Sequence, residues 1–147
     1  MDNRVIAFAL LLIACVISQA SAENVLIIGN SDMPKLDRVT VEKLFTGRII
    51  EVNGRPAMAV NAAPDSATRQ QFLMTFLAQD EDKYRAYWTV RRFIGKGTPP
   101  KELATSREII AFVKSQPGGI GYINASERTP ELNVLNGNCD VVAKINN

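Results

Sequence analysis

Hydroxyl-bearing side chains gather at the start of a predicted helix, where free backbone N–H groups can bind an anion. The segment 65–72 reads Asp-Ser-Ala-Thr-Arg-Gln-Gln-Phe and directly follows Pro64. Asp65, Ser66 and Thr68 are residue types that cap the free N–H groups of a first helical turn. The same N–H groups, aligned with the helix dipole, form a site for phosphate or a similar oxyanion. Capping alone is the alternative explanation of these residues.

The elements on either side of this segment have the pattern needed to position it. Residues 57–60 are mostly apolar and predict the end of a strand, which Pro64 then breaks. After the break, Phe72, Leu73, Phe76 and Leu77 recur on one helical face, so the helix has a side to bury. When a strand leads directly into a helix, the free N–H groups of the first helical turn are exposed to a ligand at the end of the strand.

A second pair of polar donors follows another predicted strand. Residues 23–29 form an apolar run that ends in Gly29, and a run of this kind is typical of a strand buried on both faces. Asn30 and Ser31 come next and offer an amide and a hydroxyl to a ligand. Turn formation is the alternative role for both residues.

The rest of the chain alternates strands with helices, which predicts an α/β fold with one mixed sheet flanked by helices. Tyr84, Tyr87, Trp88 and Phe93 are expected to form a core-facing stripe on their helix. The further predicted elements are a helix at 40–45 capped by Thr40 and ended by Gly47, a hairpin of 48–52 and 55–60 around Asn53-Gly54, helices at 81–93 and 106–116, the latter capped by Thr105 or Ser106, a loop at 95–100, and strands at 120–123, 132–135 and 141–145.

Composition excludes several classes of site. The chain has 147 residues, is 46% hydrophobic and 22% charged, and carries a net charge of +2, which suits one globular domain. Because lysine and arginine are scattered and nearly matched by acids, we expect no nucleic-acid partner. There is no histidine and there are two cysteines, so the chain has no His-based triad, His-ligated metal or Cys-cluster zinc site. We expect no cofactor and no enzymatic activity, because no nucleophile–base pair or carboxylate pair stands out.

The N-terminus predicts a secretion signal over residues 1–22, with a domain at 23–147. Arg4 precedes the apolar run 5–17, and Ala20-Ser21-Ala22 has the small-x-small pattern of a cleavage site. The alternative is a lipoprotein box at 12–15 that leaves a lipidated Cys15. Cleavage after Ala22 would leave Cys139 as the one cysteine, without an intramolecular disulfide partner.

Four segments occur in a fixed order after residue 22. They are 41–48 (Val-Glu-Lys-Leu-Phe-Thr-Gly-Arg), 66–72 (Ser-Ala-Thr-Arg-Gln-Gln-Phe), Tyr87-Trp88 with the loop 95–100 (Gly-Lys-Gly-Thr-Pro-Pro), and 115–122 (Ser-Gln-Pro-Gly-Gly-Ile-Gly-Tyr). Together they resemble the short phosphate-binding members of the substrate-binding proteins of ABC transporters, in the type II periplasmic-binding family. The resemblance covers nearly the whole chain after residue 22.

The resemblance implies a fold like one lobe of a two-lobed periplasmic protein that captures phosphate or a related oxyanion for an ABC importer. It implies that Ser66 and Thr68 supply hydroxyl and backbone donors and that the N–H of Ala67 joins them. An ABC permease is the implied partner, and a second copy of the chain is a candidate to complete the site. A ligand-free lobe that serves as an envelope interaction or sensory module is the alternative function.

The sequence departs from the family pattern at the same segment. Ala67 stands where the family has glycine. The family generally has an arginine a few residues before the serine, as a bidentate donor to the ligand, and this chain has none in residues 60–65. Arg69 is the candidate to replace that arginine, provided that the helix turns it toward the ligand. The chain also passes from its first strand almost directly into what resembles the second lobe, so most of a first lobe is absent.

Overall fold

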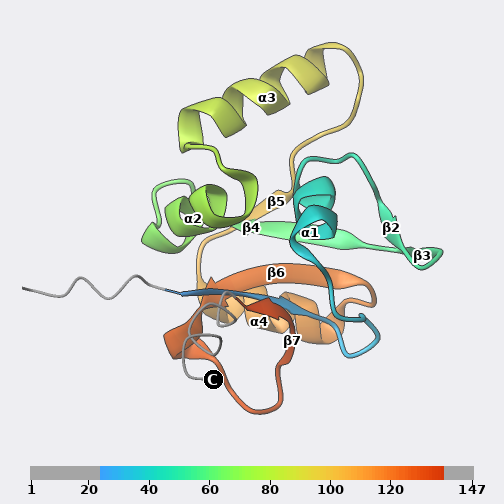
Figure 1. Ribbon diagram of the computed structural model, residues 1–147, viewed down its shortest axis with the longest axis vertical. Helices are drawn as coiled ribbons and strands as arrows, with labels where there is room; N and C mark the ends of the chain where they lie inside the picture. The colour runs from blue at the N-terminus through green and yellow to red at the C-terminus, as the bar shows by residue number, and fades with distance from the viewer. Residues whose placement is uncertain (1–23, 138–147) are drawn as a thin grey trace, which may run out of the picture.

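The computed structural model describes residues 24–137 and places them around one five-stranded mixed sheet (Figure 1). The predicted leader, both cysteines and the predicted strand at 141–145 lie outside the described residues. The elements in chain order are β1 (Val25–Gly29), α1 (Arg38–Phe45), β2 (Glu51–Val52), β3 (Arg55–Pro56), β4 (Met58–Ala62), α2 (Ala67–Phe72), the π-helical turn η1 (Leu73–Leu77), α3 (Glu81–Phe93), β5 (Lys101–Leu103), α4 (Ser106–Ser115), β6 (Gly119–Asn124), the 3₁₀ turn η2 (Ala125–Glu127) and β7 (Asn133–Gly137).

The strand order is β5-β4-β6-β1-β7, with β1 near the centre because it is apolar on both faces. Strand β4 runs parallel to β5 and β6, with Met58 opposite Gly119. Strand β1 runs antiparallel to β6, with Val25 opposite Asn124, and antiparallel to β7. Strands β4 and β1 therefore run in opposite directions, and their carboxyl ends lie at opposite ends of the sheet, measured along the strands.

Helices cover both faces of the sheet. Gly121 in β6 points toward α4, since a Cβ built on it would lie 2.6 Å from Cγ2 of Ile109. The next residue, Tyr122, points to the other face, because successive strand side chains alternate. Its ring stacks on Phe72 of α2 at 3.9 Å between centroids and lies 5.7 Å from the ring of Phe45 of α1. The predicted α/β fold, with one mixed sheet flanked by helices, is confirmed.

Helix α3 lies at one end of the long axis of the molecule, apart from the sheet (Figure 1). Its inner face docks on the end of α1. The phenol of Tyr87 donates to the carbonyl of Thr46 at 2.6 Å, and Nη2 of Arg91 donates to the carbonyl of Gly47 at 3.1 Å. Trp88 packs so closely on Gly47 that a Cβ there would be 2.7 Å from the indole, which leaves room for glycine alone.

Most local predictions agree with the structure, and three differ from it. The Asn53-Gly54 hairpin is present, with φ of 50° and 75° at these residues, but it is shorter than predicted: residues 51–52 pair with 55–56, and residues 58–60 belong to β4 of the main sheet. Thr40 does not cap α1: the helix begins earlier, and Asp37 accepts a hydrogen bond from the Thr40 N–H at 2.7 Å. Phe93 does not face the core, because it is 92% exposed. The helical period was right, but α3 has no packing partner beyond its inner face.

Two local features were left open or missed by the sequence. Thr105, rather than Ser106, caps α4, in a reciprocal capping box with Glu108. Strand β5 was not predicted, because three residues after a Pro-rich loop carry too little pattern. Within residues 24–137, no helix combines the length and apolar character needed to cross a bilayer.

Candidate functional site

The start of α2 follows the carboxyl end of β4, as the sequence predicted. The side-chain oxygen of Ser66 accepts a hydrogen bond from the Arg69 N–H at 3.2 Å and donates to the Ala63 carbonyl at 2.8 Å. Ser66 is therefore the N-cap of α2, and its hydroxyl hydrogen is already used within the turn.

Two backbone donors at this helix start remain open. The N–H groups of Ala67 and Thr68 have no hydrogen-bond acceptor among the described residues. Ala67 is exposed and Thr68 is half-buried, so both N–H groups lie at the surface of the turn. They are the groups that an oxyanion at a helix N-terminus would contact.

Arg69 is buried, at 3% exposure, and its guanidinium group is paired inside the protein rather than open at the turn. Its Nε and Nη2 donate to the two carboxylate oxygens of Glu81 at 2.8 and 2.7 Å. Its Nη1 donates to Glu102 at 2.9 Å and to the Ala62 carbonyl at 3.1 Å. Burial lowers the pKa of Arg69, but the hydrogen bonds that it donates to the two glutamates outweigh burial and raise the pKa. Four of the five guanidinium N–H groups are thus used inside the protein.

A network of buried hydrogen bonds fixes the backbone just before this site. The side chain of Asn61, 1% exposed, donates to the Tyr84 hydroxyl at 3.1 Å and accepts from the Tyr122 hydroxyl at 3.2 Å. Tyr84 donates to the Phe45 carbonyl at 2.8 Å, and Tyr122 accepts from the Ala62 N–H at 3.0 Å. Burial raises the pKa of both tyrosines, so they stay neutral.

This network of buried hydrogen bonds holds the end of β4 in place, and it was not predicted from the sequence. The polar Asn61 inside an apolar strand was the available signal, because a buried amide needs partners. Its partners are distant in sequence and could not be identified from local pattern.

The second predicted donor pair lies at the other end of the sheet. Asn30 donates through its side chain to the Val113 carbonyl at 2.8 Å, and its N–H donates to the Gly119 carbonyl at 2.9 Å. Gly119 pairs with Met58 at the beginning of β4, whereas Ser66 follows its end. The structure therefore does not bring Asn30 together with Ser66 around one small ion.

Ser31 is exposed beside Asn30 and lines a separate cavity of about 180 Å³. That cavity also contains Lys114 and Glu131, whose charged groups are 3.9 Å apart. The carboxylate offsets the ammonium there, so the cavity offers an anion little net attraction.

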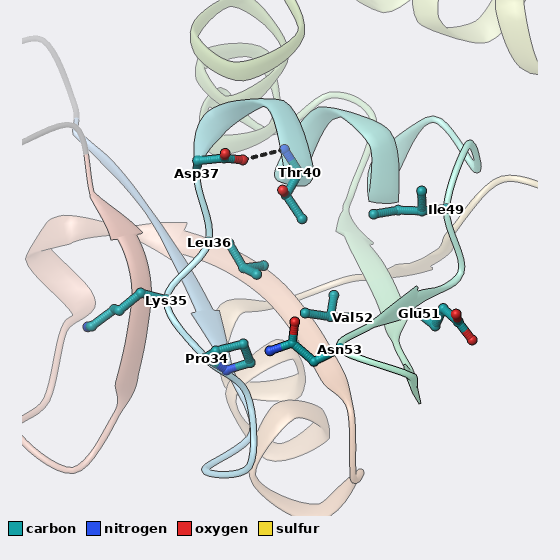
Figure 2. A pocket seen from close by; sticks show the side chains of 9 residues that line it. All are labelled: Pro34, Lys35, Leu36, Asp37, Thr40, Ile49, Glu51, Val52 and Asn53. Carbon is teal, nitrogen blue, oxygen red and sulfur yellow. Dashed lines mark hydrogen bonds between the residues drawn. The ribbon is translucent and has the colours of Figure 1, made fainter.

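A surface cavity of about 460 Å³ lies between the β1–α1 loop and the β2–β3 hairpin (Figure 2). It contains two carboxylates, Asp37 and Glu51, against one ammonium. Figure 2 shows Lys35 pointing away from Val52, and its Nζ donates to the Val134 carbonyl. The hydrogen bonds from Thr40 hold the pKa of Asp37 below its usual value. This cavity therefore disfavours anions. The lining residues are Pro34, Lys35, Leu36, Asp37, Thr40, Ile49, Glu51, Val52 and Asn53.

Within the described part of the chain, no group of three or more His, Cys, Asp or Glu side chains is placed to hold a metal ion. The start of α2 offers two open backbone donors, as the other helix starts among the described residues also do, and it is the one at which the sequence predicted an anion site. Its chemistry is that of neutral hydrogen-bond donors beside a compensated ion-pair cluster.

No family model matches the chain, and no curated protein matches it significantly. Solved structures do share its fold. An ABC-type phosphate transport receptor from Vibrio cholerae superposes with a TM-score of 0.62 at 13% identity, over 84% of this chain and 52% of the receptor. A putative phosphate ABC transporter substrate-binding protein from Clostridium perfringens, with bound phosphate, gives 0.54 at 18% identity over 77% and 44% of the two chains.

PstS from Borrelia burgdorferi gives a TM-score of 0.58 at 15% identity, over 77% of this chain and 46% of its own. The chain thus spans about half the length of these proteins. At these identities the likeness establishes the fold, which is that of one part of a phosphate-transport binding protein.

Proposed function

We propose that this chain is a non-catalytic binding protein that holds phosphate or a related oxyanion at the start of α2. The N–H groups of Ala67 and Thr68 would contact the ion, with the Thr68 hydroxyl beside them. The observation that carries the proposal is that both N–H groups are open at a helix start following a parallel strand. Helix starts of this kind bind anions without a counter-charge.

The proposed site is weak because its charge is neutral or slightly acidic. Arg69 lies next to the turn, but its positive charge is offset by ion pairs with Glu81 and Glu102, at N–O distances of 2.7 and 2.9 Å. Asp65 is exposed at the same turn and opposes an anion in the helix field. An ion on a single lobe also stays in contact with water, so its hydrogen bonds are weaker than in an enclosed site.

The physiological setting we propose is delivery of the oxyanion to an ABC-type importer in the periplasm. The similarity to phosphate-transport receptors supports this setting, as does the predicted leader of residues 1–22. Closure over the ion would then need a second surface, either another copy of the chain or the permease. Mass spectrometry of the protein exported by cells tests the leader: a chain beginning at Glu23 is expected, and a lipidated Cys15 would contradict it.

Calorimetric titration of the protein with phosphate and with sulfate tests the proposed site. Thr68→Val keeps the shape of the side chain and removes the hydroxyl, so we expect about a five- to tenfold loss of phosphate affinity. The matched control is Thr89→Val, on the exposed side of α3, which should leave the affinity unchanged. Absence of both heat and thermal shift at millimolar phosphate would refute the proposal.

A second function, that of a ligand-free interaction or sensory module, has one specific observation in its favour. Two side chains that were predicted to contact the ion are already used within the protein, since Ser66 caps α2 and Arg69 is paired with two carboxylates. A lobe that no longer binds an ion would keep these structural contacts. The same titration separates the two functions.

A further inference from the structure

The outer face of the end of α3 exposes three large apolar side chains. Val90 is 60% exposed, Phe93 92% and Ile94 57%. The opposite face of the same helix carries Tyr84 and Trp88, which are buried. Residues 90, 93 and 94 share one side because their spacing is three and four residues. Arg92 lies on the other side of the same last turn, four residues after Trp88, and Lys96 follows the helix; both are exposed. We call Val90, Phe93, Ile94, Arg92 and Lys96 the α3 tip.

The α3 tip lies within a long stretch that is basic and free of acids. Residues 83–101 include six lysines and arginines and no aspartate or glutamate, although the whole chain has a net charge of only +2. Arg92 and Lys96 are exposed and make no ion pair within the described residues. Their charges are therefore available to an external anionic group.

Local structure does not explain the tip. Cations in a last helical turn complement the helix dipole, and Arg91 in addition donates to the carbonyls of Gly47 and Lys96. Neither effect requires a phenylalanine at 92% exposure, which leaves an aromatic ring in water. Exposed apolar side chains and exposed cations at the same helix end mark an interaction surface.

We infer that the α3 tip docks on the surface of an anionic phospholipid bilayer, with Phe93 and Ile94 in the headgroup region. The charge is complementary, since each lysine or arginine near an anionic surface contributes to binding. The shape also fits, because the tip is the projecting end of the molecule (Figure 1). A bilayer adapts to a convex apolar tip, whereas a protein partner would need a matching groove.

The docking is peripheral. Helix α3 has 13 residues, about 20 Å of helix, and its inner face is packed on the protein. A few apolar side chains with basic neighbours give reversible binding that depends on salt and on lipid charge. This inference does not depend on the proposed oxyanion site, since vesicle binding and phosphate titration are separate measurements.

A tryptophan placed at position 93 tests whether the tip enters lipid. The full chain has one tryptophan, the buried Trp88, so the added signal of Phe93→Trp reports its own position. With vesicles of equal parts phosphatidylglycerol and phosphatidylcholine, we expect a blue shift of this signal and quenching by brominated acyl chains. The control is Met74→Trp, since Met74 is 59% exposed beside Asp80, Glu81 and Asp82.

The position-specific readout matters because the apolar run 5–17 of the full chain can bind lipid by itself. If that run were the only contact, the signals at 93 and 74 would be quenched equally, and the inference would be overturned. Absence of any change at 93 on anionic vesicles would overturn it as well. Equal change on pure phosphatidylcholine would refute the role of charge.

A charge variant tests the second half of the inference. The double change Arg92→Gln and Lys96→Gln should lower vesicle affinity by about 10- to 30-fold. The matched control, Arg38→Gln with Arg107→Gln, removes the same charge from exposed positions on α1 and α4 and should have little effect. Sodium phosphate should displace the protein no better than sodium chloride of equal ionic strength. Tight binding of polyglutamate without vesicle binding would overturn the inference in favour of an acidic protein partner.

Discussion

Arg69 and the α3 tip are two basic regions of one small domain, and they differ in what their charge can do. Arg69 lies at the predicted anion site but is buried, with Glu81 on one side and Glu102 on the other. Arg92 lies where no site was predicted, yet it is exposed and has no ion pair within the described residues. The charge available to a partner is therefore set by the acids that the fold places nearby, rather than by the arginine's distance in sequence from a motif.

The same contrast holds for aromatic residues. Phe72 is fully buried, and its ring stacks on Tyr122 at 3.9 Å with an interplanar angle of 6°. Phe93 has the same side chain at the solvent end of α3. Burial of one ring holds two layers together, and exposure of the other leaves it free for an external surface.

The largest expected effect concerns these two phenylalanines. Phe72→Ala should destabilise the fold by about 3–5 kcal/mol, because it leaves a cavity between α2 and the sheet. Phe93→Ala should change stability by less than about 0.5 kcal/mol. Urea denaturation followed by circular dichroism measures both, with Phe72→Leu as a milder variant if Phe72→Ala does not fold. Equal losses for the two alanine variants would contradict the assigned burial.

The next effect concerns the two arginines. Arg69→Ala should cost about 3 kcal/mol, at the lower end for a broken buried pair because Glu102 is half-exposed. Arg92→Ala should cost less than about 1 kcal/mol, since it loses only its interaction with the helix dipole. The comparison uses the same urea midpoints. A small loss for Arg69→Ala would mean that the cluster is solvated rather than closed.

The smallest effect links the ion-pair cluster to the proposed oxyanion site. Glu102→Gln removes one of the two negative charges on Arg69, so phosphate affinity should rise about two- to fivefold. Glu131→Gln removes the same charge near Lys114, on the other side of the sheet, and should have no effect on phosphate titration. A gain in affinity with both variants would indicate a general charge effect rather than release of Arg69.

Much of the fold was predictable because its signals are local. Hydrophobic period, caps and breakers predicted the strands at β1 and β6, the helix Glu81–Phe93 and the Asn53-Gly54 hairpin. The error at α1 was also local, since both Asp37 and Thr40 are capping residues and only the backbone selects one. The orientation of Phe93 was not predictable, because helical period defines a face but not whether anything packs against it.

For this protein, the sequence by itself determined the α/β class, the capped helix start after β4, and the absence of histidine chemistry. These follow from side-chain types, their period and their inventory. Tertiary structure alone decided that Arg69 forms ion pairs with two glutamates and that Asn30 and Ser66 lie at opposite ends of the sheet. It also decided that the side chains of the α3 tip are exposed. The physical reason is that strand direction and the meeting of distant carboxylates are set by long-range packing, which no local pattern contains.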